Sequence, residues 1–210
     1  MWHKVSPIAF RIPYIKYWKS IWYEDKKTYK SSLSLDVKAR EILTKELTWI
    51  PVWDILISRN QDILDVVIYT AKSALILWKT WENKERIQSL LFLKLWKKFN
   101  IEVREIKNPD LNAKIVWFNI ANQIEKRMPY KRAIKQAIAK TMEKDAKWIK
   151  IKIGWRLNWA EIARKETFKE GNIPTQTIRS DIDYVTVRAE TVYWTIGLKV
   201  WIYKWDIYKK

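Results

Sequence analysis

The sequence predicts an α+β protein built of two domains. Several segments carry apolar residues at helical spacing, and short segments of alternating apolar and polar residues lie between them. A third observation is Asn108-Pro109-Asp110, because Asn caps helices, Pro suits a first helical turn and Asp favours the positive helix end. We therefore place a boundary before Asn108, giving an N-terminal segment (1–34), a first domain (35–107) and a second domain (108–210).

The first domain is predicted to have the order helix, strand, strand, helix, strand. Helical spacing is shown by Leu35, Ala39, Leu43 and Leu47, and again by Ile87, Leu90, Leu91 and Leu95. Strands are expected at 55–58, 64–69 and 101–104, where apolar residues form a short run or alternate with polar ones.

The second domain is predicted to open with two helices and to continue with strands. The helices are indicated by Ala113, Val116, Ile120 and Ile124, and by Ile134, Ile138 and Met142. Alternation predicts strands at 149–153, 185–190 and 198–203. Polar residues alternate with apolar ones in each strand, so one face of the sheet should meet solvent or RNA.

Composition indicates a folded protein that needs a polyanionic partner. The chain has 210 residues, no cysteine and no run of eighteen apolar residues, which excludes disulfides and predicts no spanning helix. No signal peptide is expected, and a cytoplasmic location fits best. The net charge of +18 favours a nucleic acid, with an anionic membrane surface as the weaker alternative.

The loop Trp78-Lys79-Thr80-Trp81 is the first candidate RNA-binding site. It takes the place of the GxxG loop in a KH domain of the prokaryotic arrangement, between a strand and a helix starting near Glu82. Glycines let such a loop approach a nucleic-acid backbone, and the helix N-terminus favours phosphate. Both glycine positions hold tryptophan here, so an ordinary loop with two exposed aromatic residues is the alternative.

Two further candidate sites are basic. Arg127, Lys131, Arg132 and Lys135 lie at the start of a predicted helix, with Lys131 and Lys135 one turn apart on one face. Such cations hold phosphates without choosing a sequence, although a solvated charged face is the alternative. The segment 154–164 contributes Arg156 and Arg164, and its alternative is a tight hairpin connection.

No catalytic or cofactor site is predicted. The only histidine is His3, close to the terminus. Asp181 and Asp183 lie two residues apart on a predicted strand without a metal-ligating neighbour in the sequence. We therefore expect no metal, no cofactor, no small-molecule substrate and no enzymatic activity.

Five segments together resemble one family. They are 1–7 (MWHKVSP), 18–23 (WKSIWY), 146–164 (AKWIKIKIGWRLNWAEIAR), 179–184 (RSDIDY) and 199–204 (KVWIYK). Their residues and their order are similar to the opening, the paired tryptophans, the glycine-rich signature and the closing motifs of the bacterial ribosomal protein S-three family. The resemblance covers the chain nearly end to end.

The resemblance implies a type II KH domain followed by an α+β domain of two helices against a mostly antiparallel sheet. It implies a structural protein of the cytoplasmic ribosome, bound to small-subunit rRNA in the head beside neighbouring ribosomal proteins. It also implies that the protein lines the channel where messenger RNA (mRNA) enters, where Lys131, Arg132 and Lys135 help to melt mRNA structure. The first of these is Lys rather than Arg, which keeps the charge but loses bidentate geometry.

Tryptophan stands where this family has glycine. The chain has fifteen tryptophans and three glycines. The glycine positions are Trp2, Trp78, Trp81, Trp148, Trp155, Trp159, Trp194 and Trp205, with weaker support for Trp49, Trp53, Trp96 and Trp117. Trp18, Trp22 and Trp201 are tryptophan in the family too. Some bacteria read the codon UGA as glycine, so a UGA codon translated as tryptophan predicts this pattern; aromatic platforms for bases are the alternative.

Three other functions fit parts of the sequence. A repair lyase acting through a lysine would form a covalent adduct with abasic DNA. A generic KH RNA-binding protein would share the loop but not the resemblance of the second domain. A tryptophan-rich protein of membrane surfaces would need a strong basic amphipathic helix, which the sequence lacks.

Overall fold

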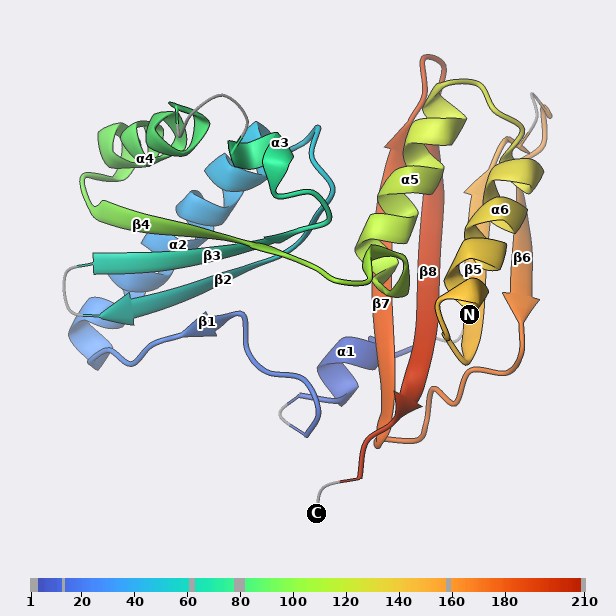
Figure 1. Cartoon of the computed structure of the whole chain (residues 1–210), viewed down its shortest axis with the longest axis horizontal. Helices are drawn as coiled ribbons and strands as arrows, with labels where there is room; N and C mark the ends of the chain where they lie inside the picture. Colours follow the sequence, from blue (N-terminus) through green and yellow to red (C-terminus); the bar gives the residue numbers. More distant parts are fainter. Residues whose placement is uncertain (1–3, 13, 61–62, 78–81, 158–159, 209–210) are drawn as a thin grey trace. The chain divides into compact units, whose positions relative to one another are not determined.

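The computed structural model describes residues 4–12, 14–60, 63–77, 82–157 and 160–208. The chain divides into two compact units, one formed by Trp18–Lys107 and the other by Met1–Tyr17 together with Asn108–Lys210. We call them the KH unit and the C-terminal unit, and Figure 1 shows the elements of each. Among the described residues, no helix is long and apolar enough to cross a membrane.

The KH unit packs helices against a four-stranded sheet. Its elements are β1 (Ser20–Ile21), α2 (Lys26–Glu46), β2 (Val52–Asn60), β3 (Ile63–Thr70), α3 (Ala74–Leu77), α4 (Glu82–Leu95) and β4 (Lys98–Glu105). The strand order is β1-β2-β3-β4, with β2 antiparallel to β3 and β3 parallel to β4. Alternating buried residues of β3, such as Val66 and Ile68, face Leu43 and Leu91 of the helices.

This arrangement confirms the predicted fold class and adds two elements, the two-residue strand β1 and the helix α3. We predicted a loop that follows a strand directly, but the short helix α3 lies between β3 and that loop. Four residues are too few for a helical period to show in a sequence, although Ile76 of α3 is buried in the core.

The C-terminal unit packs two helices on one face of an antiparallel sheet (Figure 1). Its elements are α1 (Pro7–Phe10), η1 (Pro109–Leu111), α5 (Ala113–Glu125), α6 (Tyr130–Glu143), β5 (Trp148–Trp155), β6 (Arg164–Glu170), β7 (Ser180–Glu190) and β8 (Thr195–Asp206). The strand order is β6-β5-β8-β7. Ile149, Ile151 and Ile153 of β5 alternate toward the helices and are fully buried.

Two details differ from the sequence prediction. Pro109 begins only a 3-10 turn, and α5 begins at Ala113 with Asn112 at its N-cap. Ala113 N–H donates to the carboxylate of Asp183 at 2.9 Å, so a distant strand satisfies this helix end. The strand β6 was not predicted, because its sequence is mostly charged and only the partly buried Phe168 packs against the core.

Within the predicted N-terminal segment, residues 4–12 and 14–17 are held by one buried arginine. Arg11 has no exposed surface and donates to the carbonyls of Ser180 at 2.6 Å, Thr177 at 2.8 Å and Thr175 at 3.1 Å. Lys16 adds an ion pair with Asp181 at 2.7 Å. Burial lowers the pKa of Arg11, and the charge of Asp181 opposes that shift. The segment therefore belongs to the C-terminal unit, although Arg11 precedes its partners at Pro174 and Ser180 by 163 and 169 residues.

Candidate nucleic-acid interface

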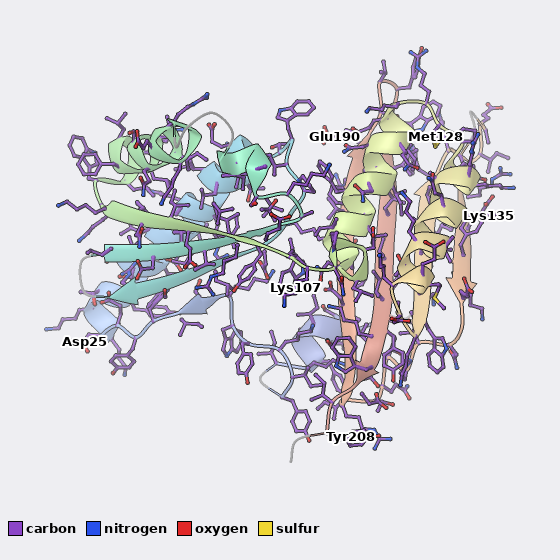
Figure 2. All side chains as sticks on the ribbon, in the orientation of Figure 1. Asp25, Lys107, Met128, Lys135, Glu190 and Tyr208 are labelled. Carbon is purple, nitrogen blue, oxygen red and sulfur yellow. The ribbon has the colours of Figure 1, made fainter. Side chains whose placement is uncertain are left out.

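The first turns of α6 display the predicted cations because the helix is amphipathic. Ala133 and Ile134 are fully buried against the sheet, so the positions beside them turn outward. Lys131, Arg132 and Lys135 are all exposed. Figure 2 marks Met128 and Lys135, which lie in the loop before α6 and in its second turn. These cations meet solvent without disturbing the core.

Tyr130 fixes the start of α6 to the edge strand β6. Its hydroxyl donates to the carboxylate of Glu166 at 3.0 Å, and Arg164 pairs with the same carboxylate at 3.3 Å. Burial and then the carboxylate of Glu166 raise the pKa of Tyr130. The Lys131 Nζ lies 6.0 Å from the centroid of the Tyr130 ring. Arg164 and Lys131 are thus held near one another by shared partners.

The remaining two predicted arginines lie at the ends of other elements. Arg127 follows α5 with a φ of 62°, is exposed, and donates its N–H to the carbonyl of Ile124 at 2.9 Å. Arg156 is exposed and follows Trp155, whose register partner is Arg164. Register and ion pairing therefore link Arg156, Arg164 and the start of α6. We call these six cations the α6 cluster: Arg127, Lys131, Arg132, Lys135, Arg156 and Arg164.

The predicted loop Trp78-Lys79-Thr80-Trp81 lies outside the described residues. Its flanks are clear: α3 ends at Leu77 and α4 begins at Glu82. Ile76 and Ile87 are buried in the core on either side of it.

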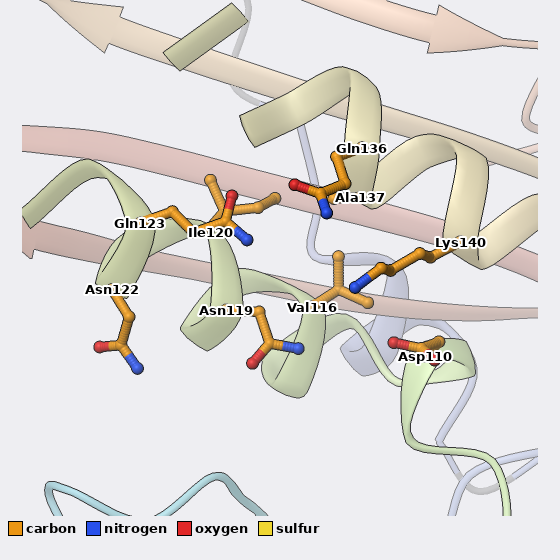
Figure 3. A pocket seen from close by; sticks show the side chains of 9 residues that line it. All are labelled: Asp110, Val116, Asn119, Ile120, Asn122, Gln123, Gln136, Ala137 and Lys140. Carbon is orange, nitrogen blue, oxygen red and sulfur yellow. The ribbon is translucent and has the colours of Figure 1, made fainter. Parts of the chain in front are cut away.

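A polar hollow of about 300 Å³ lies between α5 and α6 (Figure 3). Four of its nine lining residues carry side-chain amides; the lining consists of Asp110, Val116, Asn119, Ile120, Asn122, Gln123, Gln136, Ala137 and Lys140. Small-molecule sites are usually apolar with a few polar groups, whereas polar and apolar groups line this hollow about equally. It lacks a nucleophile beside a base among these nine residues, which argues for polar contacts rather than catalysis.

Two of the unexpected tryptophans have backbone conformations that favour glycine. Trp96 has a φ of 54° directly after α4, the position where a left-handed glycine usually ends a helix. Trp155 has a φ of 132° at the end of β5. Their side chains are 80% and 49% exposed, so little packing compensates for this backbone.

Other tryptophans at glycine positions show poor local fit. The Trp117 Nε1 is buried without a hydrogen-bond partner. Trp49 is 87% exposed. Trp53 lies at the irregularity in β2 between Val52 and Asp54. Trp2, Trp78, Trp81 and Trp159 lie outside the described residues.

Two of the three tryptophans shared with the family, Trp22 and Trp201, make specific contacts. Trp22 donates its Nε1–H to Asp36 at 2.9 Å and lies under the Arg59 guanidinium at 5.1 Å. Trp201 contacts Lys150 and Tyr184 on the sheet. Trp18 is 64% exposed, and Trp148, at a glycine position, contacts Tyr203 with ring centroids 5.2 Å apart, so contacts alone do not separate the two groups.

Comparison with known proteins gives one consistent result. A family profile described as Ribosomal protein S3, C-terminal domain, matches residues 120–202. The chain is 41% identical over 207 residues to small ribosomal subunit protein uS3 of Marinobacter nauticus, covering 99% of this chain and 91% of that protein. It is 40% identical over 210 residues to uS3 of Hydrogenovibrio crunogenus, covering 100% of this chain and 92% of that protein. It is 42% identical over 207 residues to uS3 of Acinetobacter baumannii, covering 99% of this chain and 83% of that protein.

Proposed function

The chain belongs to the bacterial uS3 family of small-subunit ribosomal proteins, and from that premise we propose that it binds rRNA of the subunit head and helps to unwind mRNA. Members of the family are structural components of the cytoplasmic ribosome and not enzymes. The proposal concerns which surfaces act: the α6 cluster on incoming mRNA, and the 78–81 loop on rRNA, beside neighbouring proteins of the head.

The α6 cluster carries the proposal for mRNA. Lys131, Arg132 and Lys135 project from a helix whose first residue is tied to β6 through Glu166, so the cations share a rigid base. Point charges of this kind hold phosphates irrespective of sequence, as a channel for every message requires. These cations stabilise mRNA in its single-stranded form, because the backbone of a separated strand can follow a fixed row of cations. Arg127, Arg156 and Arg164 extend the same positive surface.

The test is translation through a stable mRNA hairpin by ribosomes carrying Lys131→Ala, Arg132→Ala and Lys135→Ala together. We expect slower passage through the hairpin and an unchanged rate on unstructured mRNA. A matched control removes three exposed lysines of the KH unit, Lys26, Lys27 and Lys30, which lie at the start of α2. Equal slowing by both triple variants, or no slowing by the first, would contradict the assignment.

We also propose that the twelve tryptophans at family glycine positions are glycine in the native protein. Reading them so leaves three tryptophans and gives fifteen glycines, close to the usual share of about 7%. The positive φ of Trp96 and of Trp155 supports the proposal. Glycine at 78 and 81 would turn the loop into Gly-Lys-Thr-Gly, the form that lets a KH loop approach RNA closely.

Peptide mass spectrometry of small subunits from the native source tests this proposal. Peptides that span residues 148–155 and residue 96 are expected to carry glycine. The gene is expected to have UGA at the twelve positions and UGG at Trp18, Trp22 and Trp201. Tryptophan in the peptides, or UGG throughout, would reject recoding and leave the ribosomal role intact.

A further inference from the structure

The sheet of the C-terminal unit has a second face, opposite α5 and α6, on which cations gather. The strand register arranges this face in three rows across β6, β5, β8 and β7. The rows are Lys169, Lys150, Trp201, Tyr184; then Thr167, Lys152, Lys199, Thr186; then Lys165, Gly154, Gly197, Arg188. We call these twelve positions the open face.

The open face holds six cations and no carboxylate. Three acidic residues of these strands point the other way: Glu166 and Glu170 alternate with the lysines of β6, and Asp183 binds the start of α5. The nearest acidic position on this side of β7 is Glu190, one row beyond Arg188. Neighbouring strands lie roughly 4.8 Å apart, so the cations repel one another without local compensation.

Lys150 shows this crowding. Burial, and then the charges of Lys4, Lys152 and Lys169, lower its pKa. Lys4 comes from the N-terminal segment, which therefore adds a seventh cation beside the face. A cluster of like charges is unfavourable for folding, and an anionic partner removes that penalty.

On the open face, the aromatic pair Trp201 and Tyr184 positions the cation of Lys150. The Lys150 Nζ lies 5.4 Å from the centroid of the Trp201 ring, and the Tyr184 ring lies 5.0 Å from Trp201, tilted by 36°. Lys150 and Tyr184 thus already contact the ring where a base would stack. This favours binding of phosphates over reading of bases.

Two adjacent glycines leave a low area at the centre of the third row. Gly154 and Gly197 are register partners, between Lys165 on one side and Arg188 on the other. A Cβ added at Gly197 would have its nearest neighbour at 3.8 Å, so local packing does not require glycine there. Glycine within a strand often marks the close approach of another backbone.

We infer that the open face binds the sugar–phosphate backbone of an rRNA segment, as a contact separate from the α6 cluster. The inference rests on the proposed ribosomal function and names a new surface for it. Six cations across four strands, bare glycines between two of them and an occupied aromatic ring all fit a backbone that is gripped without regard to sequence. The contact fixes the position of the C-terminal unit on rRNA.

The first test measures binding of the full chain to a transcript of small-subunit rRNA over a range of salt concentrations. The variant carries Lys152→Gln, Lys165→Gln and Lys199→Gln, which leaves Lys150 on Trp201. Because three lysines no longer neutralise phosphates, we expect affinity to fall on the order of tenfold or more and the slope of log K against log salt to shrink by about 2 to 3.

Matched variants make this test specific. Lys126→Gln, Lys140→Gln and Lys144→Gln together remove the same charge from exposed positions just after α5, on α6 and just after α6, and should change the slope much less. Arginine at 152, 165 and 199 should restore binding if charge is what matters, and melting curves check that each variant folds. Equal slopes for the two glutamine variants would overturn the inference. Failure of the unaltered chain to bind would instead count against the proposed function.

The second test locates the partner. Because the chain has no cysteine, a probe attaches only at a cysteine that is introduced. An iron chelate attached to Thr186→Cys on the open face would generate hydroxyl radicals inside assembled small subunits. We expect cleavage of rRNA near this site, at positions different from those cut from Ala139→Cys on the exposed side of α6. Protection of the tether by a neighbouring protein, with no rRNA cleavage, would overturn the inference.

Discussion

The two faces of the β6-β5-β8-β7 sheet both present cations, in opposite surroundings. On the helical side, Arg164 shares the carboxylate of Glu166 with Tyr130, and the cations lie at the ends of elements. On the open face, lysines lie in the middle of strands with no carboxylate among twelve positions. Cations of which one is fixed by a carboxylate at the sheet edge suit a strand that moves past them, whereas a surface across four strands without a carboxylate suits a partner that stays.

The largest expected effect concerns the N-terminal segment that brings Lys4 to the open face. Arg11→Met removes the buried guanidinium and leaves the carbonyls of Ser180, Thr175 and Thr177 without their donor. We expect a loss of about 3–5 kcal/mol in the free energy of unfolding of the C-terminal unit, by analogy with broken buried ion pairs. Thermal and urea unfolding measure it.

A surface arginine provides the control for Arg11. Arg86→Met in the KH unit breaks only an exposed contact of 3.8 Å with Glu46 and should change stability by less than about 1 kcal/mol. A comparable small change for Arg11→Met would mean that the segment is not fixed to the sheet.

Replacing Trp155, the last residue of β5, should stabilise the protein. Trp155→Gly relieves a side chain held at a φ of 132°, and we expect a gain of about 1 kcal/mol in unfolding free energy. Trp201→Gly, in the same sheet, removes the interactions with Lys150 and Tyr184 and should lower stability instead. Destabilisation of similar size by both variants would argue against strain at Trp155.

The helical side alone should respond to Tyr130→Phe. The variant deletes the hydroxyl that donates to Glu166 while keeping the ring against Phe168. We expect about 1 kcal/mol of destabilisation and weaker hairpin unwinding, with the salt dependence of rRNA binding unchanged. A changed salt slope would show that the two faces act together.

The smallest effect concerns pH on the open face. Because the pKa of Lys150 is lowered from its ordinary 10.5 by burial and by Lys4, Lys152 and Lys169, its charge is lost earlier as pH rises. RNA favours the charged form, so binding takes up protons and should weaken by less than about threefold before the ordinary pKa is reached. Titration of affinity checks this, and Lys150→Arg, which stays charged, should remove the early decline.

The helices and central strands could be predicted from the sequence because periodicity is a local property. Ile149, Ile151 and Ile153 alternate, and the same residues are buried in the core. The start of α5 was misplaced because Asn108 and Asn112 are both good caps, and a distant carboxylate, Asp183, favours the second.

The sequence predicted that one sheet face meets solvent or RNA, but the grouping of cations on the open face depends on register between distant strands and was not predicted. Lys150 and Lys152 alternate visibly, and so do Lys165 and Lys169, but nothing local says that β5 lies between β6 and β8. In contrast, the exposed cations of α6 follow from one helical period. The family resemblance placed Trp96 and Trp155 at glycine positions, whereas their positive φ values needed the structure.

The hold of Arg11 on carbonyls near residue 180 also has a consequence in time. Because synthesis runs from the N-terminus, Arg11 leaves the ribosome well before its partners at Pro174, Thr177 and Ser180. The KH unit is continuous in sequence and can fold midway through synthesis. The C-terminal unit closes only after residues 174–180 have been made, so an exposed Arg11 segment distinguishes a chain that lacks these residues from one that has them before assembly begins.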